Sequence, residues 1–282
     1  MKRALLKSHN LIGDGLYVGP VAAEWYRQKG YEFDEIEMYV LPDHSACLYE
    51  GMGVPWNIVH EETPPYDVRI NFDVDRARGI CDERRCHLVN GYAEIAGIKS
   101  DNLQPIPNYQ PPVMEVPEDK KNLVMVSMFT RSCESRATPP KPPNKMLLWP
   151  HWKPLLELLR SEYPDSKLAL LGAPDDRLRP EYGLEVTEDE YLLGIPLPLL
   201  ANYMKYAKCV VTVDNGMGHL AASQRARHFH MACGLLALHF IVPWGNRNMR
   251  VVQITPMQLN PDTLRMQLQS AIRDWKAKEG GV

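Results

Sequence analysis

The chain has 282 residues, of which 45% are hydrophobic and 24% are charged, and its formal net charge is −3. These values are typical of a globular protein of about two domains and exclude a disordered or collagen-like chain. The longest apolar-rich run, Cys233 to Trp244, is too short to cross a bilayer, so we expect no transmembrane segment.

The first half of the chain alternates strand and helix signals. Short apolar runs predict strands at residues 3–7, 36–41 and 66–74. Apolar residues at helical spacing predict helices at residues 18–29 and 88–96. This alternation is typical of βαβ units with parallel strands.

The prolines indicate where the chain divides. Eleven of the 24 prolines lie within residues 105–154, and proline favours extended backbone and removes a hydrogen-bond donor. The prolines of residues 105–117 therefore predict an extended linker, and those of residues 139–143 predict a loop. We place the boundary between a domain of residues 1–117 and a domain of residues 118–282.

The second half repeats the alternation. Strands are predicted at residues 123–129, 167–172, 209–213 and 236–242, and helices at residues 152–163, 196–207 and 215–224. A last helix begins with an N-cap and a proline at Asn260-Pro261-Asp262, and it can pack back on the N-terminal domain. The two halves predict an α/β protein of two Rossmann-like domains that face a central ligand cleft.

Asp14 follows the first predicted strand and lies between Gly13 and Gly15. Glycines permit a tight turn, and open α/β sheets bind ligands at the carboxyl ends of their strands. Two interpretations remain open. Asp14 either caps a helix that begins near Gly15 or Leu16, or it acts as a general base on a bound substrate.

A second glycine turn, Asp214-Asn215-Gly216-Met217-Gly218-His219, follows the strand predicted at residues 209–213. A strand, a glycine turn and a helix of small residues form a helix N-terminus whose unpaired N–H groups and dipole suit an anion. His219 is expected on the first turn, where it can donate to that anion. The alternative is a capped helix whose glycines only allow close packing.

Charge is unevenly distributed around this turn. Residues 215–261 contain no Asp or Glu. The same stretch contains four histidines and the arginines Arg225, Arg227, Arg247 and Arg250. A locally positive region in a net negative chain indicates an anionic ligand, either a phosphate or a nucleic acid. Further polar and cationic groups suited to a diphosphate are Thr130, Arg131 and Lys145.

Cysteine usage and the start of the chain predict a cytoplasmic protein without metal. The six cysteines contain no C-x-x-C pair, which is typical of reduced thiols, and Lys7 interrupts the apolar start before a signal-peptide core could form. The clusters His228-Phe-His-Met-Ala-Cys233 and Cys81-x4-Cys86-His87 could offer soft ligands, but neither has zinc-finger spacing. We expect packed thiols and packed or solvent-facing histidines there.

Together these motifs resemble glycosyltransferase family nine, the heptosyltransferase-like family of the GT-B fold. Lys7 to Pro20 is similar to the family pattern K-x-x-x-x-G-D-x-x-x-x-x-P. Ala207 to Ala222 resembles the donor motif D-T-G-x-x-H-L-A-A, with Asn215 in place of the threonine. Residues 132–144 correspond to a proline-rich insertion in the donor-binding loop, and the chain is short for the family.

The resemblance implies a role for each matched residue. Asp14 would be the catalytic base of an inverting, metal-independent transfer from a nucleotide-diphosphate sugar, with no cofactor. The leaving diphosphate would be stabilised by cations and a helix dipole. The residues expected to bind substrate are Gly13, Thr130, Arg131, Lys145, Asp214, Asn215, Gly216, Met217, Gly218 and His219.

The acceptor remains open at this point. The expected acceptor is a saccharide or glycolipid, with peripheral membrane contact allowed, and the alternative is a hydroxymethylated base in DNA. The arginines Arg76, Arg78, Arg84 and Arg85 form either a solvated face or a surface for such an anionic acceptor. A protein of another class, a non-catalytic nucleotide-sugar- or nucleic-acid-binding protein, would have no need of Asp14 as a base.

Overall fold

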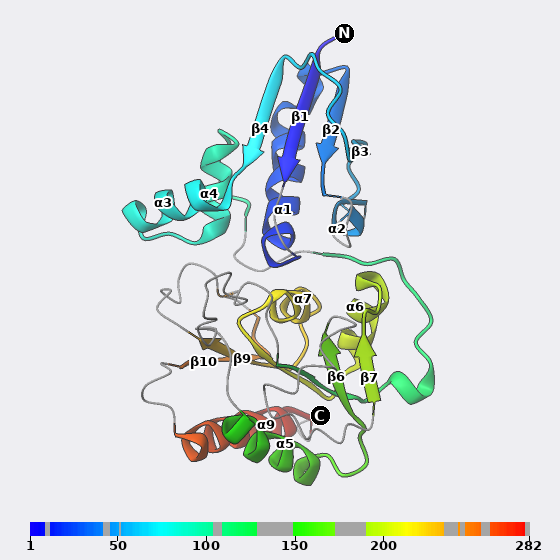
Figure 1. The fold of residues 1–282 in the computed structure, drawn as a ribbon, viewed down its shortest axis with the longest axis vertical. Coiled ribbons are helices and arrows are strands. Elements are labelled where there is room, and N and C mark those ends of the chain that lie inside the picture. Colours follow the sequence, from blue (N-terminus) through cyan, green and yellow to red (C-terminus); the bar gives the residue numbers. More distant parts are fainter. Residues whose placement is uncertain are drawn as a thin grey trace, which may run out of the picture. The chain divides into compact units, whose positions relative to one another are not determined.

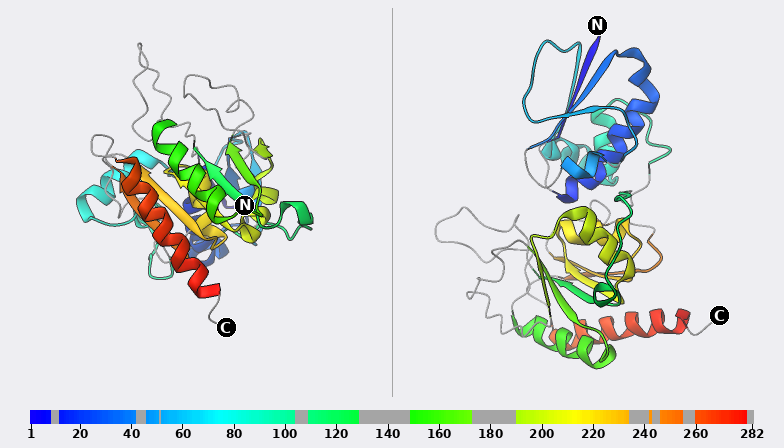
Figure 2. Two further views of the ribbon diagram at one scale, coloured as in Figure 1. Left: turned by 90° about the horizontal axis from the view of Figure 1, so that it is seen from below. Right: turned by 90° about the vertical axis from the view of Figure 1, so that its right-hand side faces the viewer.

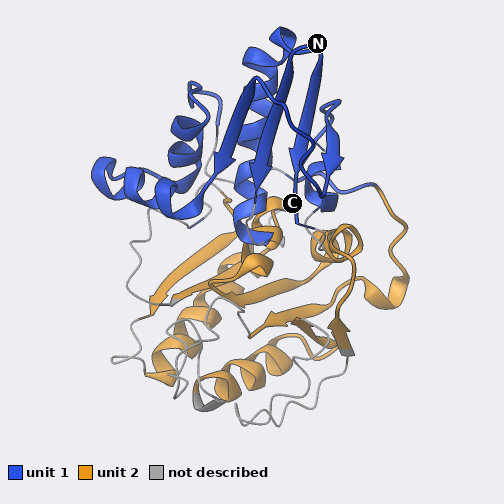
Figure 3. Cartoon of the chain, turned by 45° about the horizontal axis from the view of Figure 1, so that its top comes forward, with its two compact units in different colours: residues 1–112, 237–245 blue, residues 113–236, 246–282 orange. Residues whose placement is uncertain are grey.

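The computed structural model describes most of the chain. The described residues are 1–8, 12–41, 46–50, 52–103, 109–128, 149–172, 190–233, 242, 246–254 and 260–279. The chain divides into two compact units (Figure 3). Unit 1 comprises residues 1–112 and 237–245, and unit 2 comprises residues 113–236 and 246–282. The division after residue 112 lies close to the boundary that the prolines predict after residue 117, but the assignment of residues 237–245 to unit 1 has no signal in the sequence.

Unit 1 contains a parallel four-stranded sheet in the order β3-β2-β1-β4 (Figure 1). Its strands are β1 (Arg3–Ser8), β2 (Glu35–Tyr39), β3 (Asn57–Val59) and β4 (Val68–Phe72). Its helices are α1 (Ile12–Lys29), α2 (Ala46–Glu50), α3 (Val74–Arg84) and α4 (Leu88–Ile95), with a short 3-10 helix at Gly30–Glu32. The three strands expected from apolar runs and the two expected helices are therefore present, with shifted ends.

One face of this sheet is apolar and the other is charged. Buried residues of α1, including Leu16, Val21 and Trp25, cover the apolar face. On the other face, Arg3 donates to Glu35 at 2.8 Å and to Glu37 at 2.6 Å. The connection between β3 and β4 lies over this face, where Lys7 donates to Glu62 at 2.5 Å. Paired charges thus occupy the face that a second layer of helices covers in most parallel sheets.

Unit 2 contains a parallel six-stranded sheet in the order β10-β9-β8-β5-β6-β7. Its strands are β5 (Val124–Ser127), β6 (Leu168–Gly172), β7 (Glu190–Leu193), β8 (Cys209–Val213), β9 (His228–Cys233) and β10 (Met249–Ile254). Counted within the unit, this is the strand order 3-2-1-4-5-6 of dinucleotide-binding folds. Its helices are α5 (Trp149–Glu162), α6 (Leu197–Tyr206), α7 (Gly216–Ser223) and α9 (Pro261–Glu279), with a 3-10 helix at Glu118–Lys120.

The helices of unit 2 cover both faces of its sheet. Helices α6 and α7 lie on one side, and α5 and α9 lie together on the other (Figures 1 and 2). The core on the α5 and α9 side contains Leu155, Leu159, Leu268 and Ile272 against the strands. Helix α9 thus packs within unit 2, whereas the sequence had left open that it packs on the N-terminal domain.

The sequence predicts a strand at residues 236–242, and this segment lies outside the described residues except for Val242. The structure has strands β9 and β10 on either side of it. Among the described residues, no helix is both long enough and apolar enough to cross a membrane.

Candidate functional site

The strand order of unit 2 reverses between β5 and β8, which are paired with Ser127 opposite Thr212. In open α/β sheets, ligands bind at such a switch point, outside the carboxyl ends of the strands. β5 ends at Ser127 and β8 ends at Val213, and the turn predicted to bind an anion follows directly after Val213. The fold therefore places Asp214 and Asn215 where a nucleotide site is expected.

Asn215 connects α7 to the end of β5. Its Oδ1 accepts a hydrogen bond from the Gly218 N–H at 3.1 Å, so Asn215 is the N-cap of α7. Its Nδ2 donates to Ser127 Oγ at 2.9 Å. Asp214 beside it is buried, with 3% of its surface exposed, whereas Asn215, Gly216 and Met217 are half-buried. The first turn of α7 is thus fixed across the switch point, and its first residues remain accessible.

A cluster of histidines lies beneath this turn. Thr212 Oγ1 is 2.8 Å from His228 Nε2 and 3.2 Å from His230 Nδ1. The His219 ring on α7 has its centroid 6.3 Å from that of His230. Burial, and then the neighbouring His230 and His219, hold the pKa of His228 well below 6.5. His228 is therefore neutral, and the cluster acts as a tightly packed polar support for α7.

Gly218 provides the close approach between α7 and this cluster. A Cβ at residue 218 would lie 2.8 Å from both His230 Nδ1 and Thr212 Oγ1. Both of those side chains are fully buried. The structure thus confirms that this glycine allows close packing, and that interpretation is compatible with an anion at the N-terminus of the same helix.

Asp14 is the third residue of α1, which begins at Ile12. The interpretation of Asp14 as the N-cap of a helix starting near Gly15 or Leu16 is therefore wrong, because the helix begins earlier than the glycines suggested. A carboxylate in the first turn is still favoured by the helix dipole. Asp14 is half-buried, as is Gly13, and its Oδ1 accepts a hydrogen bond from the Tyr92 hydroxyl at 3.3 Å.

The predicted site residues fall in both units. Asp14 and Gly13 lie in unit 1, and the turn from Asp214 to His219 lies in unit 2. Three of the predicted residues, Thr130, Arg131 and Lys145, lie outside the described residues, as does the proline-rich segment 132–144. Their assignments remain predictions.

In the cluster Cys81-x4-Cys86-His87, Cys81 and His87 are buried and Cys86 is half-buried, whereas the side chain of Cys233 in the other cluster lies outside the described residues. Cys81 is buried, its Sγ donates to the His87 carbonyl at 3.3 Å, and burial raises the pKa of its thiol to about 12. His87 caps α4, accepting from the Val89 N–H at 3.2 Å. The described residues contain no group of three or more side chains that could hold a metal ion.

Asp73 and Asp75 lie at the start of α3, and both carboxylates have partners in the same helix. Asp73 caps α3 by accepting from the Arg76 N–H at 2.7 Å. Asp75 pairs with Arg78 at 3.4 Å. Nearby, Arg84 pairs with Glu94 at 2.6 Å. The arginines of α3 are thus interspersed with acids, which favours the solvated-face interpretation over a nucleic-acid surface.

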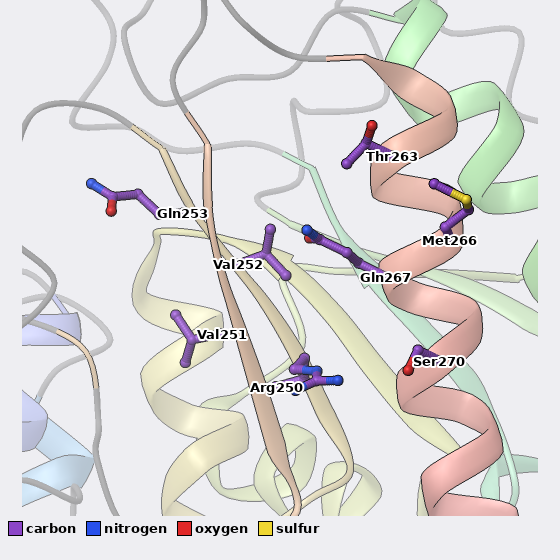
Figure 4. A pocket seen from close by; sticks show the side chains of 8 residues that line it. All are labelled: Arg250, Val251, Val252, Gln253, Thr263, Met266, Gln267 and Ser270. Atoms are coloured by element: carbon purple, nitrogen blue, oxygen red, sulfur yellow. The ribbon is translucent and has the colours of Figure 1, made fainter.

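A separate groove of about 540 Å³ lies between β10 and α9 (Figure 4). It is lined by residues 250–253 of the strand and by one side of the helix, including Met266 and Gln267. Arg250 at the groove pairs with Asp274 of α9 at 3.9 Å. An acid from α9 therefore offsets part of the positive charge of residues 215–261. None of the predicted site residues that the structure describes lines this groove.

Sequence reasoning missed two residues, Ser127 and Tyr92, that form hydrogen bonds with predicted site residues. Ser127 ends an apolar strand, and the rule that strand ends carry ligand groups could have singled it out. Tyr92 has no such signal, because it occurs within an apolar helix where an aromatic residue is expected in the core.

The chain has two units with parallel sheets, and the second unit has the dinucleotide-binding strand order with a capped helix at its switch point. These features define the GT-B class of fold. No family model and no curated protein sequence matches the chain. Solved structures do match it. The E. coli heptosyltransferase WaaC with ADP has a TM-score of 0.64 and 16% identity, covering 95% of this chain and 99% of that one.

Two further solved structures also match over nearly the whole chain at low sequence identity. The E. coli ADP-heptose lipopolysaccharide heptosyltransferase II has a TM-score of 0.58 and 14% identity over 98% of this chain and 100% of that one. A family 9 glycosyltransferase from Veillonella parvula has a TM-score of 0.58 and 14% identity over 97% of both. The chain therefore has the fold of the heptosyltransferases and of glycosyltransferase family nine.

Proposed function

We propose that the chain is an inverting glycosyltransferase that transfers a sugar from a nucleotide-diphosphate donor to the hydroxyl of a saccharide or glycolipid. The observation that carries this proposal is the bridge made by Asn215, which caps α7 and bonds Ser127 at the switch point. This bridge presents the N–H groups of α7 to an anion. The ADP bound to the heptosyltransferase WaaC supports a nucleotide donor.

In the proposed reaction, the Asp14 carboxylate takes the proton of the acceptor hydroxyl as its oxygen attacks the anomeric carbon. The bond between that carbon and the diphosphate oxygen breaks, and the configuration at the carbon inverts. The negative charge of the leaving diphosphate is stabilised by the N-terminus of α7, by His219 and by the cation Lys145. No metal is required for any of these steps.

The experiment is a transfer assay with a panel of sugar nucleotides in the presence of EDTA, comparing Asp14→Asn with the unsubstituted chain. We expect turnover to fall at least 10²-fold, the lower end of general base contributions, while nucleotide affinity measured by calorimetry is unchanged. Asp101→Asn, at an exposed position of the same unit, is the control and should keep full turnover.

Near-normal turnover of Asp14→Asn would show that Asp14 is not the base. Binding of nucleotide without any transfer across the panel would favour the non-catalytic binding protein. Transfer to duplex DNA bearing hydroxymethylated bases, and to no saccharide or glycolipid, would replace the proposed acceptor class.

A further inference from the structure

The hydroxyl of Tyr92 reaches Asp14 from the interior of unit 1. Tyr92 lies on α4 and is fully buried, with 0% of its surface exposed. Its hydroxyl donates a hydrogen bond to Asp14 Oδ1 at 3.3 Å. Its ring meets Phe72, at the end of β4, edge-on at a centroid distance of 6.2 Å. Tyr92 lies between the end of β4 and the first turn of α1, and it can therefore fix the orientation of the Asp14 carboxylate.

The packing of α4 holds Tyr92 in place. His87, the N-cap of α4, packs its ring against Tyr17 of α1 at 4.9 Å, and its Nε2 lies 3.1 Å from the Val242 carbonyl oxygen. One residue before Tyr92, a Cβ at Gly91 would lie only 2.6 Å from the Ala77 carbonyl of α3. Helix α4 is thus in close contact with both α1 and α3, so the Tyr92 hydroxyl has little freedom to move.

We propose that Tyr92 is a positioning residue for Asp14, holding the carboxylate through Oδ1 in the orientation that takes the proton of the acceptor. This inference rests on the proposed function, because it acts through the base of that reaction. A hydrogen bond donated to a carboxylate favours its ionised form. The hydrogen bond from Tyr92 therefore orients the Asp14 carboxylate and favours its ionised form before the acceptor binds.

The electrostatic surroundings keep the Tyr92 hydroxyl a donor. Burial raises the pKa of Tyr92 far above 10, and the charge and hydrogen bond of Asp14 raise it further. Of the other groups that face it, Tyr49 acts in the same direction and Arg78 of α3 in the opposite one. Tyr92 consequently stays protonated throughout the pH range of an assay and is not itself the base.

The test is Tyr92→Phe, which removes only the hydroxyl. We expect kcat to fall about tenfold with the donor KM unchanged, and the acid limb of the pH profile to move about one pH unit higher, since a lost hydrogen bond no longer favours the carboxylate. NMR titration of the Asp14 carboxyl carbon should show the same displacement. The matched control is Tyr66→Phe, because the Tyr66 hydroxyl donates to another carboxylate of unit 1, Glu37, at 2.5 Å.

Two results would overturn the inference. One is an Asp14 titration that is the same in Tyr92→Phe and in the unsubstituted chain. The other is a lower kcat with an unchanged pH profile, which a purely structural role predicts. If Asp14→Asn retains turnover, the proposed base is refuted instead, and the NMR titration still decides whether Tyr92 controls the carboxylate.

Discussion

At the scale of single residues, Asn215 makes two separate contributions through one side chain. Its oxygen caps α7 and its nitrogen bonds Ser127. Asn215→Ala removes both bonds. Loss of an N-cap costs about 1 kcal/mol of folding stability, and loosening the first turn of α7 is expected to weaken nucleotide binding about tenfold, or about 1.4 kcal/mol. Urea unfolding and calorimetric titration with nucleoside diphosphates measure the two effects.

The matched control for Asn215→Ala is another N-cap. Asp73 caps α3 in unit 1 through the Arg76 N–H. Asp73→Ala should cost a similar stability, about 1 kcal/mol, and leave nucleotide affinity unchanged. Equal nucleotide affinity in both variants would mean that Asn215 only caps its helix.

The residues that the sequence identified are those whose chemistry follows from local position. Asp14 and Asn215 each come soon after a buried strand, and the parallel fold brings strand ends to a ligand. The two bonds that define their surroundings, to Tyr92 and Ser127, join residues 78 and 88 positions apart. Such long-range partners depend on helix packing and strand order, which local patterns do not specify.

At the scale of secondary-structure elements, the contact between α3 and α4 depends on Gly91. A Cβ there would lie 2.6 Å from the Ala77 carbonyl oxygen and 2.9 Å from Cys81 Sγ. Because a backbone atom cannot move aside, Gly91→Ala is expected to destabilise unit 1 by about 1–3 kcal/mol. Gly79→Ala in α3 is the control, since nothing lies within 4 Å of its added Cβ. It should stabilise by about 0.4–1 kcal/mol.

Thermal and urea unfolding of the two glycine variants measure this difference. Equal stabilities would show that α3 and α4 can separate at little cost. In that case the packing that holds Tyr92 would also be looser than the distances indicate.

The strands that the sequence predicted with the best ends are those with continuous apolar character. β5 and β8 are buried along their whole length and were found with nearly correct ends. β9 was missed because its buried residues include His228 and His230, polar side chains that Thr212 contacts at 2.8 and 3.2 Å. Helix α3 was missed because it is mostly polar, and its N-cap, Asp73, lay inside the predicted strand at residues 66–74.

At the scale of the whole molecule, the two units differ in how they use charge. Unit 1 offsets cations with acids on one face of its sheet, whereas unit 2 buries the neutral His228 beneath α7. A histidine that is buried in its neutral form makes folding depend on pH. The pKa of His228 is lowered by burial, so the unfolded chain binds a proton that the folded chain does not.

The stability of unit 2 should therefore be fully present above pH 6.5, the ordinary pKa of histidine, and decline as the pH falls below it. His228 contributes up to about 1.4 kcal/mol per pH unit. His228→Gln keeps a polar group near Thr212 but cannot gain a proton, so urea unfolding between pH 8 and 5 should show a flatter decline, whatever its stability at pH 8. An unchanged slope would mean that His228 does not couple protonation to folding, and the acid sensitivity would then have to arise from other groups.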